Sequence, residues 1–191
     1  ALKKHEFEVY YQPILNTQTQ KFSNLEALIR WNHPIKGVIS PFSFISLMED
    51  MGMIHDLTEI VVQSVLKDLS DWEKQGSEPL KVSINLSGRE FNEPQIQSLL
   101  TPILAANRTQ QIEFELTESY LMSHAETVQT LLQSIRTTGI TLSVDDFGTG
   151  YSSLSYLKRF PIDKLKIDQS LVRDISDDNS DRAIVSAVVA L

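Results

Sequence analysis

The feature that most constrains the fold is an alternation of strand-like and helix-like patterns through most of the 191 residues. After an initial pair of strand patterns, each further short β-prone run is followed by a longer run whose apolar residues recur at helical spacing. The predicted strands begin near residues 7, 22, 81, 112, 140 and 163. Repeated βα units of this kind form parallel sheets, either doubly wound or closed into a barrel.

The first two strands are expected to be connected differently. Phe7, Val9 and Tyr11 alternate with polar residues, and a polar turn over residues 16–20 leads directly into the second strand, residues 22–30. A short connection of this kind joins antiparallel strands, whereas parallel strands need a long crossover. We therefore expect an antiparallel hairpin followed by parallel strands.

Capping patterns mark several helices. Ser40 followed by Pro41 predicts the start of a short helix. Ser123 and Glu126 fit the capping box S-x-x-E at the start of a later helix. The buried stripe of the first of these helices is predicted to consist of Phe44, Leu47, Met48 and Met51.

Polar residues on the strands distinguish the two architectures. Strands of a doubly wound sheet are covered on both faces and are apolar throughout, whereas one face of these strands carries charged or amide side chains. Glu113 and Lys164 lie deep on that face, where a mutual ion pair is one interpretation. Near the carboxyl ends of their strands lie Glu26, Asn85, Glu115, Asp145 and Lys166. These side chains would converge at the top of a (β/α) barrel, where the catalytic groups of that fold lie.

The stretch DDFGTGYSSL, residues 145–154, directly follows the apolar run 140–144. Because successive side chains of a strand point to opposite faces, Asp145 and Asp146 reach one site only if the strand ends between them. The glycines that follow let the backbone turn into a short helical segment. Taken alone, the stretch has an equally good interpretation as an acidic surface turn.

Four carboxylates at one barrel mouth would repel one another without a cation. Glu26, Glu115, Asp145 and Asp146, together with Asn85, make an all-oxygen ligand set of the kind that Mg²⁺ or Mn²⁺ prefers. Each acid alone is more often a solvated surface residue, and it is their shared position that favours a metal site. Two ions would suit phosphoryl chemistry.

Other residues near these strand ends have two interpretations each. Arg30 could meet a phosphate with its planar guanidinium, and Lys166 could act on the substrate or on an attacking water. A structural ion pair with a neighbouring acid is the alternative for both. Glu118 could bind metal, but we favour a role in bracing the DDFGTG loop.

Composition excludes several classes of function. The formal net charge of −8 argues against broad binding to polymeric nucleic acid or anionic membranes. The chain has no cysteine, which excludes thiolate chemistry, and its four histidines contain no H-x-x-x-H pair, which disfavours a His-ligated zinc. No run approaches the roughly 20 apolar residues of a membrane span, so we expect no membrane insertion.

These motifs together resemble the EAL domain of cyclic di-GMP phosphodiesterases, over essentially the whole chain. The matching segments are YQPI (11–14), LEALIRW (25–31), INLS with Asn85, ELTES (115–119), DDFGTGYSSL and the KID segment with Lys166. The resemblance implies a modified TIM (β/α)₈ barrel with an antiparallel first strand. It also implies Mg²⁺- or Mn²⁺-dependent hydrolysis of cyclic di-GMP to linear pGpG, with two ions.

The resemblance also assigns roles to individual residues. Glu26, Asn85, Glu115 and Asp145 would ligate metal, and Asp146 would serve the second ion. Lys166 would hold the nucleophilic water, and Glu118 would support the loop that begins at Asp145. Gln12, Leu28 and Arg30 would contact the dinucleotide.

One departure from the family lies at the C-terminus. EAL domains continue through two more strands with an AEGVE-type segment, whose first Glu is a metal ligand and general base, and the chain has no such segment. We therefore expect residues 1–191 to be an EAL domain that stops after about six strands. Fusion to sensory or GGDEF-type domains, a cytoplasmic location (free or as part of a membrane-anchored sensor) and a homodimer are further expectations. The alternatives are a catalytically silent EAL module that binds cyclic di-GMP or a protein, and a general dinucleotide phosphodiesterase.

Overall fold

The computed structural model describes residues 1–149, 157, 159–173 and 175–190. Its sheet begins with β1 (Phe7–Asn16) and β2 (Lys21–His33), which pair antiparallel with Gln12 opposite Glu26. Parallel strands follow, each beside the one before it: β4 (Lys81–Asn85), β5 (Ile112–Thr117), β6 (Thr141–Phe147) and β7 (Lys164–Ile167). The predicted hairpin and the six predicted strands are thus confirmed.

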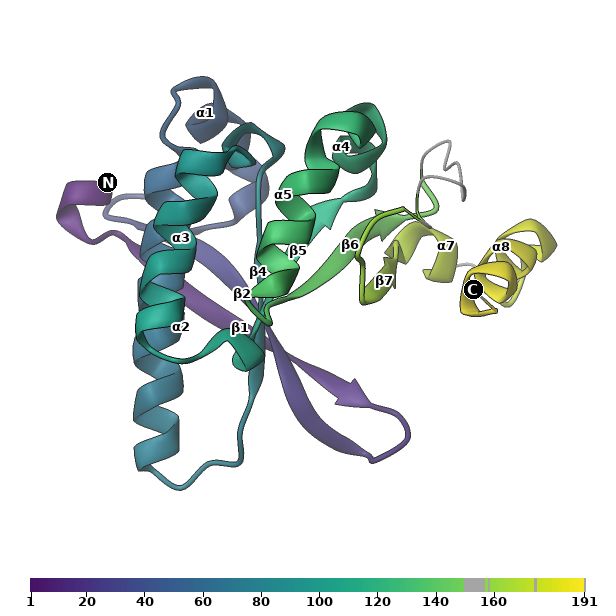
Figure 1. The fold of residues 1–191 in the computed structure, drawn as a ribbon, viewed down its shortest axis with the longest axis horizontal. Helices are drawn as coiled ribbons and strands as arrows, with labels where there is room; N and C mark the ends of the chain where they lie inside the picture. Colours follow the sequence, from purple (N-terminus) through teal and green to yellow (C-terminus); the bar gives the residue numbers. More distant parts are fainter. Residues whose placement is uncertain (150–156, 158, 174, 191) are drawn as a thin grey trace.

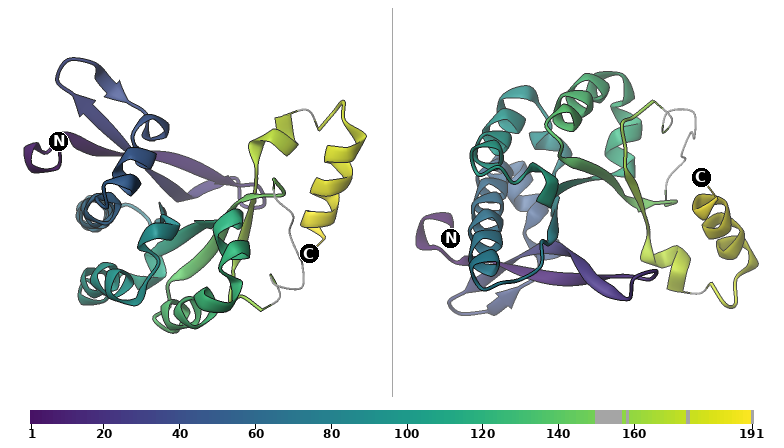
Figure 2. Two further views of the ribbon diagram at one scale, coloured as in Figure 1. Left: turned by 90° about the horizontal axis from the view of Figure 1, so that it is seen from above. Right: turned by 60° about the horizontal axis from the view of Figure 1, so that its bottom comes forward.

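The order of the strands and the placement of the helices favour the barrel-type interpretation. The sheet order is β1-β2-β4-β5-β6-β7, so spatial order follows chain order without the reversal of a doubly wound sheet. Helices α2 (Ile54–Lys74), α3 (Glu93–Ala105) and α5 (Ala125–Thr137) lie along the same side of this curved sheet (Figures 1 and 2). Within the described residues β1 and β7 are the two edges, and they do not pair with each other.

The hydrophobic core lies between these helices and the sheet. Val65 of α2 and Leu99 of α3 are fully buried, as are Val82 of β4 and Phe114 of β5. Each apolar side chain that leaves water in this way contributes about 1.5–3 kcal/mol to the stability of the fold. The strand residues between the apolar ones face the other side of the sheet, so the core helices hold the polar face in place.

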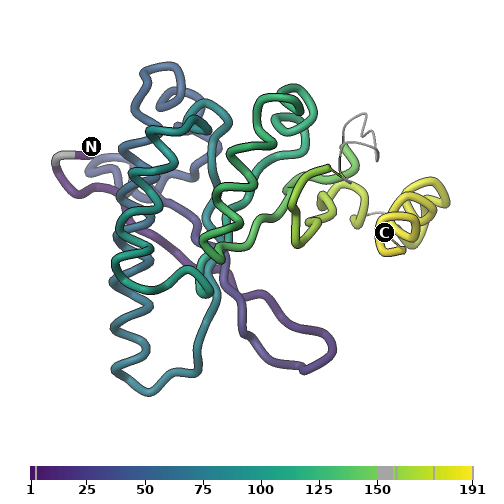
Figure 3. Tube along the Cα trace, viewed as in Figure 1, coloured from purple at the N-terminus to yellow at the C-terminus, as the bar shows by residue number. Residues whose placement is uncertain are grey.

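The remaining elements are shorter and lie between the larger ones or at the chain ends. The α-helices are α1 (Ile45–Asp50), α4 (Glu118–Ser123), α7 (Gln169–Arg173) and α8 (Asn179–Val189), and the 3₁₀ turns are η1 (Leu2–Lys4), η2 (Pro41–Ser43), η3 (Gly88–Glu90) and η4 (Thr109–Gln111). The trace shows the chain ends on opposite sides of the molecule, with α8 next to the C-terminus (Figure 3). None of the helices in the described part of the chain combines the length and apolar character of a membrane-spanning segment.

Strand β3 (Gly37–Ile39) is not among the predicted elements. It pairs antiparallel with the end of β2, which runs on to His33. The ring nitrogen Nδ1 of His33 accepts hydrogen bonds from the backbone N–H groups of Ile35 and Lys36 and so closes the turn between the strands. Pro34 ends the apolar pattern in the sequence, which hides this short hairpin.

Two expectations about helices were wrong. Ser123 is the last residue of α4 and its hydroxyl donates to the carbonyl groups of Ser119 and Tyr120, so it forms no capping box with Glu126. The cause is that α4 extends almost to the start of α5, which leaves Ser123 in helical geometry. In the earlier helix, Leu47 and Met51 are 57% and 59% exposed because the first turn is the separate η2 and the buried face is rotated. The Ser40 side chain makes no capping hydrogen bond, although Pro41 does occupy the first position.

The strand that precedes DDFGTG also differs from its prediction. Strand β6 does not end at Val144 but continues through both acids to Phe147. Its pairing with β7 shifts register between Val144 and Phe147, and Asp146 has a φ of 55°, in the left-handed region. A bulge therefore separates the directions of the two acids without ending the strand. The helical segment expected after the loop falls on residues that lie outside the described ranges.

Candidate active site

The amino group of Lys166 lies among three carboxylates at one end of the sheet. Lys166 Nζ is 3.2 Å from Glu26 Oε2 and 3.2 Å from Asp145 Oδ2, and it also contacts Glu115 Oε2. Carboxylate oxygens of the three acids lie within 4.8 Å of one another. With Lys166 counted, the cluster keeps a formal charge of −2, which matches one divalent cation.

Strand register explains why residues far apart in sequence meet here. Asn85 pairs with Glu115 across β4 and β5, and Thr117 pairs with Asp145 across β5 and β6. Because the strands are parallel, the polar side chains before each carboxyl end lie at one level of the sheet. Asn85 Nδ2 donates to Glu26 Oε1 at 3.0 Å and so links Asn85 to the cluster.

Burial and charge set the protonation of this cluster. Glu115 is 1% exposed; burial raises the pKa of its carboxyl, and the hydrogen bond and charge of Lys166 oppose that rise. Burial would lower the pKa of Lys166, but its hydrogen bond to Glu115 and the charges of Glu115, Asp145 and Glu26 outweigh burial and raise that pKa. The neighbouring acids therefore favour the charged form of Lys166.

One atom of the cluster points to a missing partner. Glu115 Oε1 is buried and has no hydrogen-bond partner among the described residues. An unpaired buried carboxylate oxygen costs about 1–3 kcal/mol or more, so such atoms in proteins normally face an ion, a water or a ligand. The donor set of carboxylate oxygens and an amide therefore fits a hard divalent ion.

Asp146 lies beside a different acid. It does not belong to the cluster of Glu26, Glu115 and Asp145, and its carboxyl lies near that of Asp168, one residue beyond β7, to which it can donate a hydrogen bond when protonated. Burial and the charges of Asp145 and Asp168 raise the pKa of Asp146. Hydrogen bonds from Ser170 lower the pKa of Asp168. Asp146 and Asp168 thus form a second, adjoining acidic pair.

Glu118 contacts the loop after β6. It is 1% exposed, and its Oε2 accepts a hydrogen bond from the backbone N–H of Gly148 at 2.8 Å. Gly148 has a φ of +100°, and a Cβ there would lie 2.4 Å from Leu171 Cδ1. The backbone conformation favours glycine at this position, and a Cβ would also displace the end of the Leu171 side chain. The hydrogen bond from the Gly148 N–H to Glu118 is the contact expected if Glu118 braces this loop.

The residues expected to contact a dinucleotide lie along the first hairpin. Gln12 is exposed and stands directly opposite Glu26 across the β1–β2 ladder, which places both side chains on one face. Leu28 and Arg30 continue that face along β2. The guanidinium of Arg30 donates to the Ile29 carbonyl and lies 5.8 Å from the ring centre of Tyr10.

A second polar layer lies below the cluster. Lys164 Nζ is 2.5 Å from Glu113 Oε1, and the Ser83 hydroxyl donates to the same oxygen at 2.8 Å. Glu113 is 3% exposed. The structure thus supports the interpretation of Glu113 and Lys164 as an ion pair. Because their charges balance, the layer beneath the acids of the upper cluster has no excess charge.

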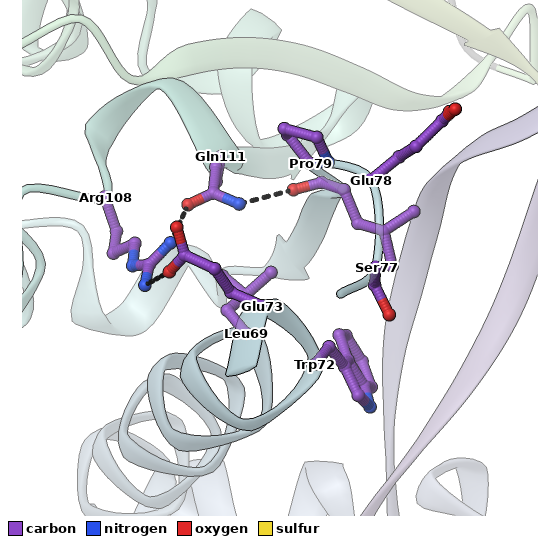
Figure 4. Close-up of a pocket in the computed structure, with 9 residues that line it drawn as sticks. Leu69, Trp72, Glu73, Ser77, Glu78, Pro79, Arg108 and Gln111 are labelled. Atoms are coloured by element: carbon purple, nitrogen blue, oxygen red, sulfur yellow. Dashed lines mark hydrogen bonds and ion pairs between the residues drawn. The ribbon is translucent and has the colours of Figure 1, made fainter. Parts of the chain in front are cut away.

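Two of the cavities in the described part of the chain lie at opposite ends of the strands. One, of about 300 Å³, opens beside Leu28 and Asn85 and extends to Glu90 below helix α1. The other, of about 130 Å³, lies where β4 and β5 begin. Figure 4 shows that Arg108, Glu73 and Gln111 meet in this second cavity, through an Arg108–Glu73 ion pair and an Arg108–Gln111 hydrogen bond. Such contacts at the amino ends of barrel strands serve stability, whereas the first cavity borders Asn85 of the candidate site.

Comparison with known proteins agrees with this geometry. The family model of the EAL domain matches residues 1–191. The chain belongs to the EAL domain family. This EAL domain is 38% identical to cyclic di-GMP phosphodiesterase NbdA of Pseudomonas aeruginosa and 38% identical to cyclic di-GMP phosphodiesterase PdeR of Escherichia coli, each over 193 residues and the whole of this chain. It spans only 25% and 29% of the length of those relatives.

A solved structure gives the same fold. The PaMucR phosphodiesterase in complex with c-di-GMP superimposes with a TM-score of 0.93 at 35% identity, over 100% of this EAL domain and 78% of the solved chain. The TIM-barrel type expected from the sequence is therefore confirmed, with an antiparallel first strand and a sheet that is open in the described residues.

Three residues of this region did not emerge from the sequence. Asp168 could have been found from its position two residues after Lys166, at the carboxyl end of its strand. Glu90 and His55, which face each other behind the candidate site, have no sequence signal, because a Glu in S-G-R-E and a His at a helix start are ordinary surface patterns.

Proposed function

We propose that this EAL domain hydrolyses one phosphodiester of cyclic di-GMP to linear pGpG with the help of Mg²⁺ or Mn²⁺. The observation that carries the proposal is the position of Lys166 among Glu26, Glu115 and Asp145 at the carboxyl ends of the strands. Family membership and relatives named as cyclic di-GMP phosphodiesterases support the choice of substrate.

In this proposal Glu26, Asn85, Glu115 and Asp145 hold one ion, and Asp146, with Asp168 beside it, serves a second. When bound, such ions supply Lewis-acid polarisation of a phosphate oxygen. The orphaned Glu115 Oε1 and the formal charge of the cluster support a cation at this place.

The remaining residues bind, orient and position. Lys166 keeps its proton and so acts as a fixed positive charge that holds the attacking water through an N–H donor. Arg30 offers a planar pair of donors to a phosphate, and Gln12 and Leu28 line the approach along β1 and β2. Glu118 holds the backbone of Gly148, and with it the loop that follows Asp145 and Asp146.

The proposal extends to the protein in which the domain acts. Since the domain spans about a quarter of relatives such as NbdA, we propose that it works beside sensory or GGDEF-type domains in the cytoplasm, where a homodimer is one assembly to test. Size-exclusion chromatography with light scattering measures that assembly directly.

The decisive experiment incubates the protein with cyclic di-GMP and Mn²⁺ and separates the products by chromatography. We expect pGpG to form when the domain carries the general-base segment of the family, and we expect a chelator to prevent its formation. A linear dinucleotide and cyclic di-AMP in parallel reactions test for a general phosphodiesterase. Binding of cyclic di-GMP by calorimetry without any pGpG would instead favour the receptor function and contradict the enzymatic one.

A further inference from the structure

Behind the candidate site, Glu90 of η3 is completely buried and faces His55 of α2. Glu90 Oε1 and His55 Nδ1 are 3.6 Å apart, and neither atom has a hydrogen-bond partner among the described residues. Burying two polar atoms that face each other without a hydrogen bond costs free energy, so such a contact is unusual in a folded protein.

The other nitrogen of His55 shows where one proton lies. The Ser98 hydroxyl of α3 donates its proton to the Gln95 carbonyl at 2.9 Å, so it can only accept from His55 Nε2, which is 2.8 Å away. Glu59 Oε1, also an acceptor, lies 3.3 Å from the same nitrogen. His55 Nε2 therefore carries a hydrogen, and in the neutral ring Nδ1 is a bare acceptor.

A bare Nδ1 and an ionised Glu90 would be two acceptors facing each other in a buried space. A single proton between Glu90 Oε1 and His55 Nδ1 satisfies both, either as a carboxylic acid that donates to the ring or as a carboxylate that accepts from the imidazolium. The two atoms then need only a small approach to form a normal hydrogen bond.

The pair is connected to the strand end that carries Asn85. Glu90 Oε2 accepts from the Thr58 hydroxyl at 2.9 Å and from the Ser87 backbone N–H at 3.4 Å. The Ser87 hydroxyl donates to Glu49 Oε1 of α1 at 2.6 Å. Ser87 lies two residues after Asn85, and the cavity beside Asn85 reaches Glu90. Glu90 thus anchors the turn after β4 from behind.

We propose that Glu90 and His55 share one proton and that this pair is a positioning device, which holds Ser87 and the Asn85 end of β4 in place and releases them when the proton is lost as pH rises through neutrality. The relevance of this pair to catalysis rests on the proposed function, in which Asn85 is a metal ligand. The shared proton itself is independent of that function.

The electrostatic surroundings agree with a proton held near neutrality. Burial raises the pKa of Glu90 to about 7, against hydrogen bonds from Thr58 and Ser87 that lower it. The charged groups that face it are Glu49 from α1 and Glu59 from α2, both acids that raise the pKa further, besides His55 itself. From α3 the neighbouring group is the Ser98 hydroxyl, which contacts His55.

The test is NMR of protein with ¹⁵N-labelled histidine and backbone amides, titrated from pH 5 to pH 9. In the wild type we expect the neutral ring of His55 to carry its proton on Nε2. We expect the signals of the Ser87 amide and the Asn85 side-chain amide to shift at the pH at which the pair loses its proton. In Glu90→Gln the amide group donates to Nδ1 at every pH. The shifts of the Ser87 and Asn85 signals with rising pH should therefore disappear in this variant.

Glu126→Gln, an exposed acid on α5, is the charge-matched control and should titrate as the wild type does. A neutral His55 with its proton on Nδ1 would overturn the shared proton. Ser87 and Asn85 signals that ignore the midpoint would overturn the positioning role. If these signals behave as expected while the protein neither binds Mn²⁺ nor hydrolyses cyclic di-GMP, the proposed function fails and the inference stands.

Discussion

At the scale of single residues, the same side-chain type acts differently according to its surroundings. Glu115 and Glu113 lie two residues apart on β5, both almost fully buried. The charge of Glu113 is balanced by Lys164, and its carboxylate also accepts a hydrogen bond from Ser83. Glu115 shares Lys166 with two other acids, and one of its oxygens has no hydrogen-bond partner among the described residues. Excess negative charge is therefore confined to the upper layer, where a cation can relieve it.

Removing an acid of the upper cluster should abolish metal-dependent hydrolysis. Glu26→Ala or Asp145→Ala is expected to lower kcat/KM for cyclic di-GMP by at least about a hundredfold, the scale of losing a principal electrostatic group. Glu126→Ala is the control on an exposed helix face, and circular dichroism checks the fold of each variant. Activity near that of the wild type would exclude these residues as ligands.

Glu90 should also make stability depend on pH. Because burial raises the pKa of Glu90 from an ordinary 4.5 to about 7, the folded state binds more protons between these values. The Glu90 contribution to stability is therefore complete below about pH 4.5 and is lost as pH rises to about 7, at most about 3.4 kcal/mol in all.

Glu90→Gln removes that dependence, since the amide does not titrate. Urea unfolding of the wild type and the variant at pH 5 and pH 8 measures it. We expect the variant to gain stability relative to the wild type on going from pH 5 to pH 8. An identical difference at both values would contradict the raised pKa.

At the scale of elements, β6 and the loop after it depend on two unusual backbone positions. The bulge at Asp146 turns this acid toward Asp168 while Asp145 stays with Lys166. Gly148 then passes against Leu171 of α7, and Glu118 of α4 holds its N–H. Helices α7 and α4, both distant in sequence, thus fix the loop that follows the two acids.

Gly148→Ala should strain this loop. The positive φ and the 2.4 Å approach to Leu171 both oppose a Cβ, so a loss of about 1–3 kcal/mol in the free energy of unfolding is expected. Because Leu171 is itself buried, Leu171→Ala serves only as a second background: without the contact, but with the φ strain still present, Gly148→Ala should cost less there than in the wild type. Full tolerance of alanine, measured by urea unfolding, would show that the loop adapts freely.

Helix α5 offers a test of the core. Leu132 is completely buried, whereas the adjacent Leu131 is only partly buried. Leu132→Ala is expected to cost about 2–5 kcal/mol through the cavity that it leaves, and Leu131→Ala clearly less. Equal losses in denaturant unfolding would mean that the assignment of the buried face is wrong.

At the scale of the whole molecule, a net charge of −8 and a concentrated acidic cluster make a cation a stabilising ligand. Mn²⁺ at about 100 times its dissociation constant should add about 2.7 kcal/mol to the free energy of unfolding and raise the thermal midpoint. Asp145→Asn should remove most of this effect, while Asp50→Asn, on the exposed side of α1, should keep it. Equal Mn²⁺ effects in the two variants would locate the binding elsewhere.

The sequence alone was sufficient to predict the hairpin, the βα order and the residues that meet at the strand ends. Glu26, Glu115, Asp145 and Lys166 were predictable because strand periodicity assigns a side chain to a face and parallel pairing brings the carboxyl ends to one level. Short-range rules failed where long-range contacts decide. A weak three-residue pairing such as β3 has little pattern of its own, and a helix that reaches Ser123 removes its capping role.

Only the tertiary structure could decide which charges are balanced and which are not. The charge of Glu113 is balanced by Lys164, whereas one oxygen of Glu115 has no partner among the described residues. Asp146 lies beside Asp168, and Glu90 faces His55. Each of these outcomes depends on distances of a few ångströms between segments far apart in the chain. Electrostatic energy and pKa respond steeply to such distances and to burial, and neither quantity is contained in the order of the residues.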